Sequence, residues 1–218
     1  MFRGVLFDVD GTLLDSSDFF YRACEYTFQA HGLPARTREE VLAVIRLGQP
    51  LETCYHHLSP GVSSAQLCET HRSFQMLNVQ LCVPFGNTRE TVRLLWQEGI
   101  ALAAVTTRSR RTSLKTLELA GIAEYLSAII SGEDTRQHKP HPAPLWQALE
   151  RLNLPAEQTV MVGDTEADIL AGRRAGTRTI AVSYGLSGTS IAESQPDWIV
   201  DDIQQILPLV LAGQFHSS

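Results

Sequence analysis

The stretch that decides the fold is VLFDVDGT, residues 5–12. It places a short apolar run, Val5-Leu6-Phe7, directly before the carboxylates of Asp8 and Asp10. An apolar run of this length is typical of a buried strand. In open α/β sheets, ligands bind beyond the carboxyl ends of the strands. The stretch therefore predicts a buried strand that ends in a functional loop.

Further short apolar runs follow along the chain, and amphipathic stretches with helical spacing separate them. The runs are Ile100 to Val105, Ala128 to Ile130, Val160 to Val162 and Thr179 to Val182. Buried strands that alternate with helices are typical of a parallel sheet covered on both faces. Right-handed crossovers make such a sheet doubly wound. We therefore expect an α/β fold with a doubly wound parallel sheet.

Residues 15–83 differ from both flanks because they contain no strand-like run. Helical spacing begins near Phe20 and stops at Gly32, and it also suits residues 38–46 and 64–81. We expect a small all-helical cap at 15–83, inserted after the first strand. The α/β core then comprises residues 1–14 and 84–218. Two chain crossings between the lobes suggest a hinged lid.

Composition narrows the class of function. The chain has 218 residues, 44% of them hydrophobic and 19% charged, with a net charge of −6. These values exclude wholesale disorder and argue against a sequence-independent grip on nucleic acid. No apolar run reaches the roughly 18 residues that a membrane helix needs, and Asp8 interrupts any secretory apolar segment. We expect a cytoplasmic protein, a monomer or homodimer, that acts on a small molecule.

The four cysteines all fall between residues 24 and 82, without a Cys-x-x-Cys pair. We expect them to be reduced and buried. Cys54, His56 and His57 precede Cys68 and His71 and offer N and S donors for zinc. The interval from Cys68 to His71 is also one helical turn, so core packing is the favoured interpretation.

Polar residues follow the other apolar runs as well. Thr106 and Thr107 come after the second run, Lys139 after the third, and Asp164 after the fourth, with Asp168 one helical turn later. Carboxylates that are held together repel one another, and a Mg²⁺ ion with oxygen ligands would remove that repulsion. A carboxylate nucleophile, a neighbouring acid and phosphate-binding groups together favour phosphoryl transfer.

Four motifs resemble those of the haloacid dehalogenase (HAD) superfamily. They are DVDGT at residues 8–12, Thr106, Lys139, and Gly163-Asp164 with Asp168, in the family's order. The later part of the chain, from Val105 to Gly176, resembles the phosphoglycolate phosphatase group and, almost as well, its inorganic pyrophosphatase members. The resemblance implies a Mg²⁺-dependent phosphatase that cleaves a small phosphorylated metabolite through an aspartyl-phosphate intermediate.

The resemblance also implies roles for single residues. Asp8 would be the nucleophile and Asp10 the general acid and base. The residues expected in catalysis are Asp8, Asp10, Thr106 and Lys139; those expected to bind substrate are Thr106, Thr107, Lys139 and Gln49; those expected at the metal are Asp8, Asp10, Asp164 and Asp168. Asp168 would support the metal site by contacting its ligands and not the ion itself. Gln49 lies in the cap turn where related enzymes present residues to substrate.

Several alternatives stay open. Many relatives carry Asn after the second-motif hydroxyl, whereas this chain reads Thr106-Thr107-Arg108, so Thr107 is an alternative for that hydroxyl. Asp168 also has the spacing of a helix-capping box with Thr165. Arg108 either attracts an anionic substrate or lies in a solvated helix start.

The reaction itself also has alternatives. The same residues suit an inorganic pyrophosphatase, a phosphosugar mutase that returns the phosphoryl group to its substrate, or a metal-free dehalogenase. A binding protein on an inactive scaffold is disfavoured because Asp8, Asp10, Lys139 and Asp164 are all present.

Overall fold

The computed structural model describes residues 2–212, and its main sheet consists of six parallel strands. The strand order is β5-β4-β1-β6-β7-β8. The strands are β1 (Gly4–Phe7), β4 (Ala101–Val105), β5 (Ala128–Ile130), β6 (Thr159–Gly163), β7 (Arg178–Val182) and β8 (Trp198–Val200). This arrangement confirms the predicted doubly wound α/β fold.

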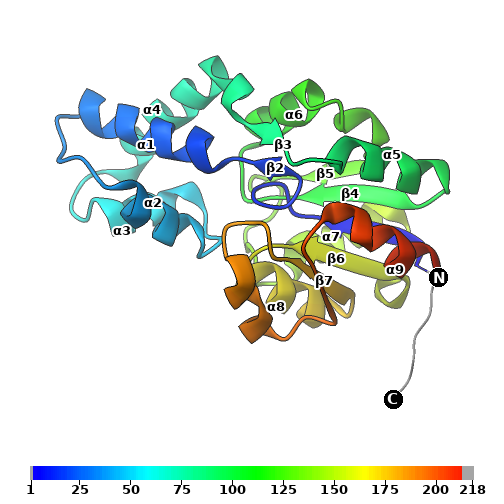
Figure 1. The fold of residues 1–218 in the computed structure, drawn as a ribbon. Helices are drawn as coiled ribbons and strands as arrows, with labels where there is room; N and C mark the ends of the chain where they lie inside the picture. The colour runs from blue at the N-terminus through cyan, green and yellow to red at the C-terminus, as the bar shows by residue number, and fades with distance from the viewer. Residues whose placement is uncertain (1, 213–218) are drawn as a thin grey trace.

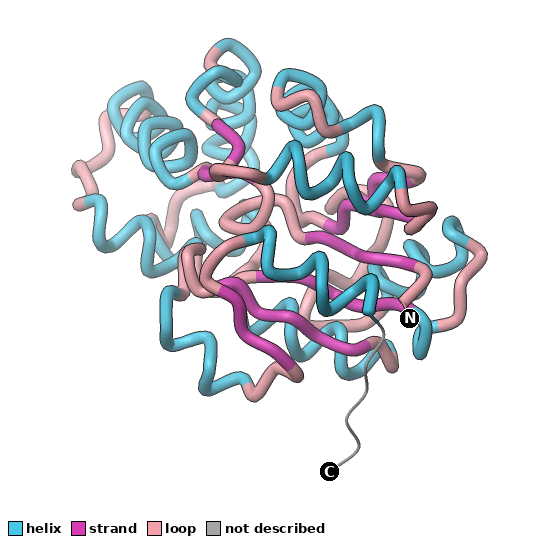
Figure 2. Tube along the Cα trace, turned by 45° about the vertical axis from the view of Figure 1, so that its right-hand side comes forward, coloured by secondary structure: helices cyan, strands magenta, loops and turns pink. Residues whose placement is uncertain are grey.

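Helices cover both faces of the sheet (Figure 2). On one face, the strand residues Val5 and Phe7 join a core with α5 (Thr88–Gln97), α6 (Arg110–Leu119) and α9 (Ile206–Ala212). On the other face, Leu6 joins a core with α7 (Ala143–Leu152) and α8 (Glu166–Ala175). Successive side chains of a strand point to opposite faces. A short, wholly apolar strand such as β1 therefore supplies both cores.

The order of the strands places the end of β1 at the centre of the sheet. From β1 the chain first builds outward through β4 and β5, and it then returns to build outward on the other side through β6, β7 and β8. In open α/β sheets, the crevice for ligands lies where the direction of winding reverses. The carboxyl end of β1 lies at that point.

Four helices lie between β1 and α5 in sequence and form a separate layer of the molecule (Figure 1). These cap helices are α1 (Ser17–Ala30), α2 (Arg38–Ile45), α3 (Leu51–Leu58) and α4 (Ser64–Leu77). They have a core of their own, in which Cys24, Phe28, Tyr55 and Leu67 are buried. The two chain crossings pair as a small antiparallel sheet of β2 (Leu14–Asp15) and β3 (Val83–Pro84). The division into a core and a cap at 15–83 stays a prediction.

The structure adds elements that were not predicted, among them α3, α5, α9 and β8. Helix α3 has Leu51, Cys54, Tyr55 and Leu58 at helical spacing, so its signal was present in the sequence. Strand β8 spans only three residues and has no clear period. The expected helix at 64–81 is also interrupted: α4 ends at Leu77, and a separate 3₁₀ turn, η1, spans Val79–Leu81.

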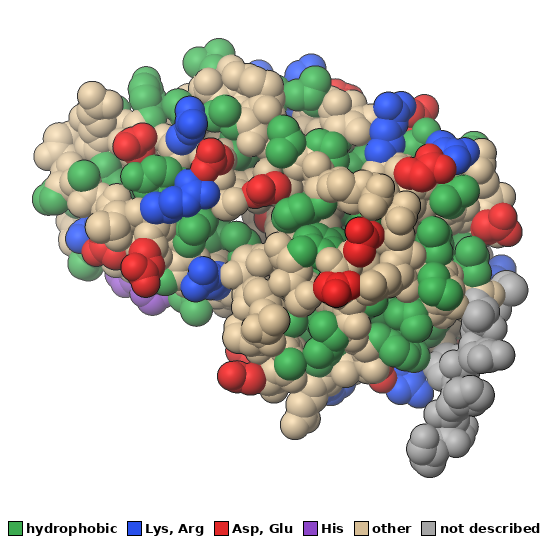
Figure 3. Space-filling model, viewed as in Figure 1, with side chains coloured by type: hydrophobic (Ala, Val, Ile, Leu, Met, Phe, Trp, Pro, Cys, Tyr) green, Lys and Arg blue, Asp and Glu red, His purple; other side chains and the backbone are tan. Residues whose placement is uncertain are grey.

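Acidic and basic side chains are interspersed on the face shown in Figure 3. Ion pairs among the described residues include Arg38 with Asp18 and Arg72 with Glu52. Within residues 2–212, no helix is long and apolar enough to cross a membrane. The four cysteines are free and buried, as expected.

Candidate active site

The site is built where β1, β4 and β6 end side by side. Phe7 pairs in register with Ala104 of β4 and with Val162 of β6. Asp8 directly follows β1, Thr106 follows β4, and Asp164 follows β6. The Asp8 backbone N–H donates to the Val162 carbonyl at 2.9 Å, which continues the ladder into the loop. The sheet therefore brings these side chains to one edge, as the sequence predicted.

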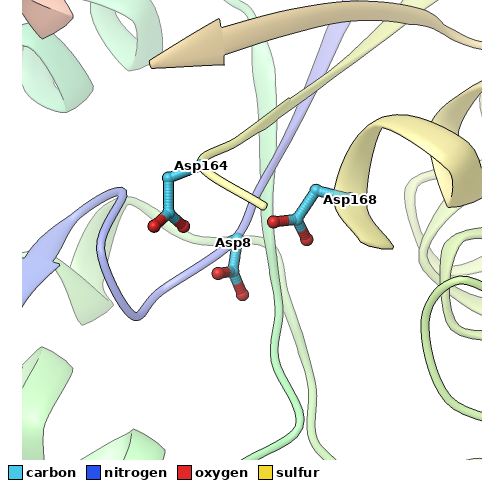
Figure 4. A group of neighbouring side chains, drawn as sticks. All are labelled: Asp8, Asp164 and Asp168. Carbon is cyan, nitrogen blue, oxygen red and sulfur yellow. The ribbon is translucent and has the colours of Figure 1, made fainter. Parts of the chain in front are cut away.

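Three carboxylates converge at this edge. Each of Asp8, Asp164 and Asp168 offers an oxygen, and these oxygens lie within 4.8 Å of one another. Figure 4 shows Asp8 and Asp164 at the ends of their strands and Asp168 reaching toward them from α8. All three residues are buried. Like charges at this separation disfavour the ionised state unless a cation lies among them.

Lys139 supplies one positive charge to the cluster. Its Nζ donates to Asp8 Oδ1 at 2.7 Å, to Asp168 Oδ1 at 2.6 Å and to the Val105 carbonyl at 3.0 Å. Burial by itself would lower the pKa of Lys139, but the charges of Asp168 and Asp8 outweigh it and raise that pKa. Lys139 is therefore a fixed ammonium at the base of the site.

The charges of the cluster fit a divalent cation. Against three carboxylates, Lys139 brings a single ammonium, which leaves two negative charges without a counterion in the cluster. Burial raises the pKa of Asp8 to about 7, and burial together with the Asp8 charge raises the pKa of Asp164 well above its usual range. Both carboxylates offer the hard oxygens that Mg²⁺ prefers. The donor set therefore suits a metal ion of this kind.

Asp164 is held by its surroundings in one orientation. Its Oδ1 accepts from the Thr12 hydroxyl at 3.2 Å, and its Oδ2 accepts from the Leu186 backbone N–H at 2.7 Å. Gly11 has a φ of +79°, and a Cβ atom there would lie 2.2 Å from Asp164 Oδ2. A Cβ atom on Gly185 would lie 2.4 Å from the Gly11 carbonyl oxygen. The first motif thus needs glycine both for its backbone conformation and for its close approach to Asp164.

Asp168 has two partners in the structure. Its Oδ2 accepts from the Thr165 backbone N–H at 3.1 Å and from the Thr165 hydroxyl at 2.6 Å, which supports the start of α8. Its Oδ1 accepts from Lys139. The capping interpretation is therefore borne out by these contacts, and the carboxylate also positions Lys139.

Asp10 forms a two-point ion pair with Arg108. Arg108 Nε donates to Asp10 Oδ2 at 2.8 Å, and Nη2 donates to Asp10 Oδ1. The Arg108 side chain is 8% exposed. A solvated helix start is thus excluded for Arg108, which lies beside the expected acid. Sequence reasoning had left this residue open.

The two candidate hydroxyls of the second motif differ in their surroundings. Thr106 is buried, and its Oγ1 accepts from the Arg108 backbone N–H at 3.1 Å. Thr107 lies on the wall of the cavity described next. Both positions are close to Asp8 in the fold, so both stay candidates for holding a phosphoryl group.

A small cavity of about 70 Å³ opens between the sheet edge and the cap helices. The residues of the α/β core that line the cavity are Asp8, Asp10, Thr107, Arg108, Ser109, Thr112, Lys139, Thr165 and Leu186. The residues between β2 and β3 that line it are Phe20, Ile45, Gly48, Gln49, Leu51, Cys54, His71, Arg72 and Gln75. Gln49 is therefore at the position expected of a substrate-contacting residue. The turn that carries it is close to α8, since a Cβ atom on Gly48 would lie 3.1 Å from Thr165 Oγ1.

The cap side also contributes residues that the sequence did not single out as binding groups. His71 and Gln75 are one helical turn apart on α4, and both are buried. His71 Nδ1 lies 2.8 Å from the Tyr55 hydroxyl, and its Nε2 has no hydrogen-bond partner among the described residues. The predicted cap boundaries together with the helical period of α4 could have placed this pair on the inner face.

Of the cysteines and histidines among the described residues, Cys54 and His71 line the cavity and the others do not. Within residues 2–212, the carboxylate trio is the one cluster suited to a metal, so the Cys and His residues of the cap are not gathered as a zinc site. His138 and His141 flank Lys139 but do not line the cavity. His141 Nδ1 instead accepts from the Ala143 backbone N–H at 3.1 Å.

Comparison with known proteins identifies relatives along nearly the whole chain. Residues 5–182 match the family model described as haloacid dehalogenase-like hydrolase. The pyrophosphatase PpaX of Halalkalibacterium halodurans is 31% identical over 207 residues, which cover 94% of this chain and 95% of that protein. The phosphoglycolate phosphatase of Pectobacterium atrosepticum is 34% identical over 223 residues, which cover 99% of this chain and 95% of that protein.

Solved structures agree with these relatives. A predicted phosphoglycolate phosphatase from Haemophilus somnus superposes with a TM-score of 0.85 at 26% identity, covering 95% of this chain and 97% of that one. A predicted phosphatase from Clostridium acetobutylicum has a TM-score of 0.86 at 20% identity, covering 97% of this chain and 99% of that one, and it shows the same fold.

Proposed function

Because this chain belongs to the haloacid dehalogenase-like hydrolase family and is a phosphatase of that family, we propose that it is a Mg²⁺-dependent enzyme that hydrolyses a small phosphorylated metabolite through a phosphorylated Asp8. One observation carries this proposal. The Asp8 carboxylate lies on the wall of a small cavity, 2.7 Å from the Lys139 ammonium, and the Asp10 carboxylate lies on the same wall. A nucleophile, a fixed cation and an acid thus border one small cavity.

Asp8 and Asp10 would divide the reaction into two displacements. In the first, an Asp8 carboxylate oxygen forms a bond to phosphorus while the bond to the leaving oxygen breaks, and protonated Asp10 gives its proton to that oxygen. In the second, a water loses its proton to Asp10 as its oxygen attacks the phosphorus of the aspartyl phosphate. Inorganic phosphate leaves, and the Asp8 carboxylate is restored with Asp10 protonated again.

Lys139 and the residues after β4 would hold the phosphoryl group. The Lys139 ammonium is buried, and Asp168 and the Val105 carbonyl hold two of its three N–H donors, so the third can pass from Asp8 to a phosphoryl oxygen when Asp8 bonds to phosphorus. Thr106 or Thr107 would add a hydroxyl donor from the neighbouring strand end. These groups stabilise charge that develops on the transferred phosphoryl oxygens.

The carboxylates of Asp8 and Asp164 and the backbone carbonyl of Asp10 would hold Mg²⁺, with Asp168 behind them. The ion supplies positive charge that offsets the repulsion between the carboxylates and the phosphate. In this chain, Thr12 and Leu186 fix Asp164 in place for that role.

The relatives suggest two substrates for the first experiments. One group is named phosphoglycolate phosphatase and the other pyrophosphatase PpaX. Phosphoglycolate and inorganic pyrophosphate both carry a negative charge on the leaving group, and Arg72 lines the cavity on the side of the cap helices, where that group would lie. We propose a substrate of this anionic kind, selected in part by Gln49.

A phosphate-release screen tests the proposal. Purified protein is assayed with Mg²⁺ against phosphoglycolate, pyrophosphate and a set of hexose phosphates, with Asp8→Asn as the matched inactive control. We expect Mg²⁺-dependent release that the variant lacks. Isomerised sugar phosphate without free phosphate would instead indicate a mutase. Release that persists in Asp8→Asn would overturn the role of Asp8. A cytoplasmic location and a monomeric or dimeric state also remain predictions.

A further inference from the structure

Arg108 is a buried cation with partners on several separate elements. Its guanidinium donates to both carboxylate oxygens of Asp10, to Thr116 Oγ1 at 3.1 Å and to Cys82 Sγ at 3.3 Å. Its Cζ lies 4.9 Å from the ring centroid of Phe19. Few side chains have a planar fork of donors that can meet all these groups at once, and Lys does not.

These partners connect the catalytic loop with both crossings to the cap helices. Asp10 belongs to the loop after β1. Phe19 lies in the first turn of α1, where the chain enters the cap helices, and Cys82 lies between η1 and β3, where it returns. Thr116 belongs to α6 of the core. One guanidinium therefore touches the first turn of α1, the residue directly before β3, and the carboxylate that we assign as acid and base.

The two-point pair fixes the plane of the Asp10 carboxylate. Parallel N–H donors from Nε and Nη2 hold both oxygens, so rotation of the carboxylate breaks at least one charge-assisted hydrogen bond. Each oxygen keeps a second lone pair, which can carry the proton that Asp10 gives to the leaving oxygen. The pair is largely withdrawn from solvent, with side-chain exposures of 8% for Arg108 and 20% for Asp10. Few water molecules can therefore replace a donor that is lost.

We propose that Arg108 is a positioning residue that orients Asp10 toward the leaving oxygen and, through Phe19 and Cys82, links this orientation to the placement of the cap helices. The inference rests on the proposed function, which gives Asp10 its role in proton transfer. Arg108 itself transfers no proton and forms no bond to phosphorus.

Leaving groups of different basicity separate this role from simple substrate binding. An alkyl phosphate needs protonation of its leaving oxygen, whereas 2,4-dinitrophenyl phosphate releases a stable anion without it. The ratio kcat/KM reports every step up to departure of the leaving group. A misplaced acid therefore lowers kcat/KM for the alkyl ester and spares the aryl ester.

The experiment measures kcat/KM for both esters in the wild type and in Asp10→Asn, Arg108→Gln and Arg108→Lys, with melting temperature as a check of folding. The alkyl ester is the best one found in the screen. We expect Arg108→Gln to lower kcat/KM about 100-fold for the alkyl ester and less than about threefold for the aryl ester. We call this difference between the two esters the split, and we expect Asp10→Asn to show it as well. Arg108→Lys keeps the positive charge but lacks the paired guanidinium donors, and we expect it to show the split too. If Arg108→Gln does not fold, Arg108→Lys takes its place in the comparison.

Arg110→Gln is the matched control. Arg110 lies two residues after Arg108, at the start of α6; its side chain is half exposed and pairs with Asp134 away from the cavity. We expect it to leave both values unchanged. Phe19→Leu should show the split to a smaller degree, because it removes the ring beneath the guanidinium but keeps the apolar volume.

The outcomes distinguish failure of the positioning role of Arg108 from failure of the proposed phosphatase function. An equal loss on both esters in the Arg108 variants, or no loss, overturns the positioning role while the proposed phosphatase mechanism stands. Absence of a split in Asp10→Asn overturns the assignment of Asp10 and the positioning role with it. A wild-type protein that hydrolyses neither ester overturns the proposed function.

Discussion

Lys139 Nζ lies 2.6 Å from one carboxylate oxygen of Asp168, and both side chains are buried. The same nitrogen donates to Asp8. Asp168 is in turn fixed by Thr165 at the start of α8. The position of the Lys139 ammonium beside Asp8 is thus set by a helix terminus, so that the start of α8 and the geometry of the carboxylate cluster depend on one side chain.

Lys139→Met removes the one ammonium from this cluster. We expect the free energy of unfolding to fall by about 3 kcal/mol or more at pH 7, because loss of one partner leaves buried charges unpaired. Hydrolytic activity should fall to background at the same time. Lys115→Met is the control, since Lys115 is exposed on α6 and should tolerate the change. Denaturant unfolding of both variants gives the comparison, and equal stabilities would contradict the prediction.

Gly11→Ala tests the close approach of the first motif to Asp164. The added Cβ would lie 2.2 Å from Asp164 Oδ2 and must displace that carboxylate or the loop. We expect activity to fall at least about tenfold, because a misplacement of about 1 Å in an active site has effects of this size or greater.

Gly32→Ala is the matched control for this glycine. Gly32 also has a positive φ, +62°, but a Cβ there meets no atom within 4 Å. Both variants carry backbone strain, so only the contact with Asp164 differs. Similar activities in the two variants would argue against a requirement for close approach.

Mg²⁺ should stabilise the folded protein through Asp8 and Asp164. A ligand that binds only the folded state raises the free energy of unfolding as its concentration exceeds Kd. We expect the melting temperature to rise with Mg²⁺ in the wild type and not in Asp164→Asn.

Without added metal, the Asp164→Asn variant should be at least as stable as the wild type, because one of three repelling charges is gone. Asp18→Asn, at an exposed surface ion pair, is the control and should keep the response to Mg²⁺. A wild-type melting temperature that ignores Mg²⁺ would count against the metal site.

His71 should make stability sensitive to acid. Burial lowers the pKa of His71 to about 3, and the charges of Arg72 and Arg108 act in the same direction. In the unfolded chain its pKa is about 6.5. Between these values the unfolded state binds a proton that the folded state does not. The contribution of neutral His71 to the free energy of unfolding is therefore fully present above about pH 6.5. It decreases as the pH falls, by about 2 kcal/mol at pH 5.

The comparison of His71→Phe with the exposed His57→Gln measures this contribution. Denaturant unfolding at pH 7 and pH 5 should show a smaller loss in His71→Phe than in the wild type, with His57→Gln matching the wild type. An unchanged loss in His71→Phe would mean that His71 is charged in the folded protein or does not titrate in this range.

The sheet and its polar edge were predictable because their signals are local. Apolar runs that end in Asp8, Thr106 and Asp164 are read directly from the sequence, and parallel strands bring such ends to one edge. The capping box of Asp168 is equally local, since it spans a single helical turn.

The Arg108–Asp10 pair and the contact of His71 with Tyr55 were not predictable in the same way. Arg108 and Asp10 are 98 positions apart, and their contact depends on where α6 begins relative to the loop after β1. The spacing of Cys68 and His71 favoured core packing, and His71 is buried. An isolated helix nevertheless gives no sign of Tyr55 as its neighbour, because that contact depends on how α3 and α4 pack. Strand β8 is too short to show a period at all.

The central claim is that Asp8 carries the phosphoryl group, and acid quenching tests it most directly. Enzyme and Mg²⁺ are mixed with an excess of the best substrate, quenched in acid within milliseconds, reduced with borohydride and digested for mass spectrometry. We predict conversion of Asp8 to homoserine in the wild type, none in Asp8→Asn, and more in Asp10→Asn than in the wild type if breakdown of the intermediate becomes slower than its formation. Rapid phosphate release with Asp8 unmodified at every quench time, while free phosphate exceeds the enzyme concentration, would contradict the account.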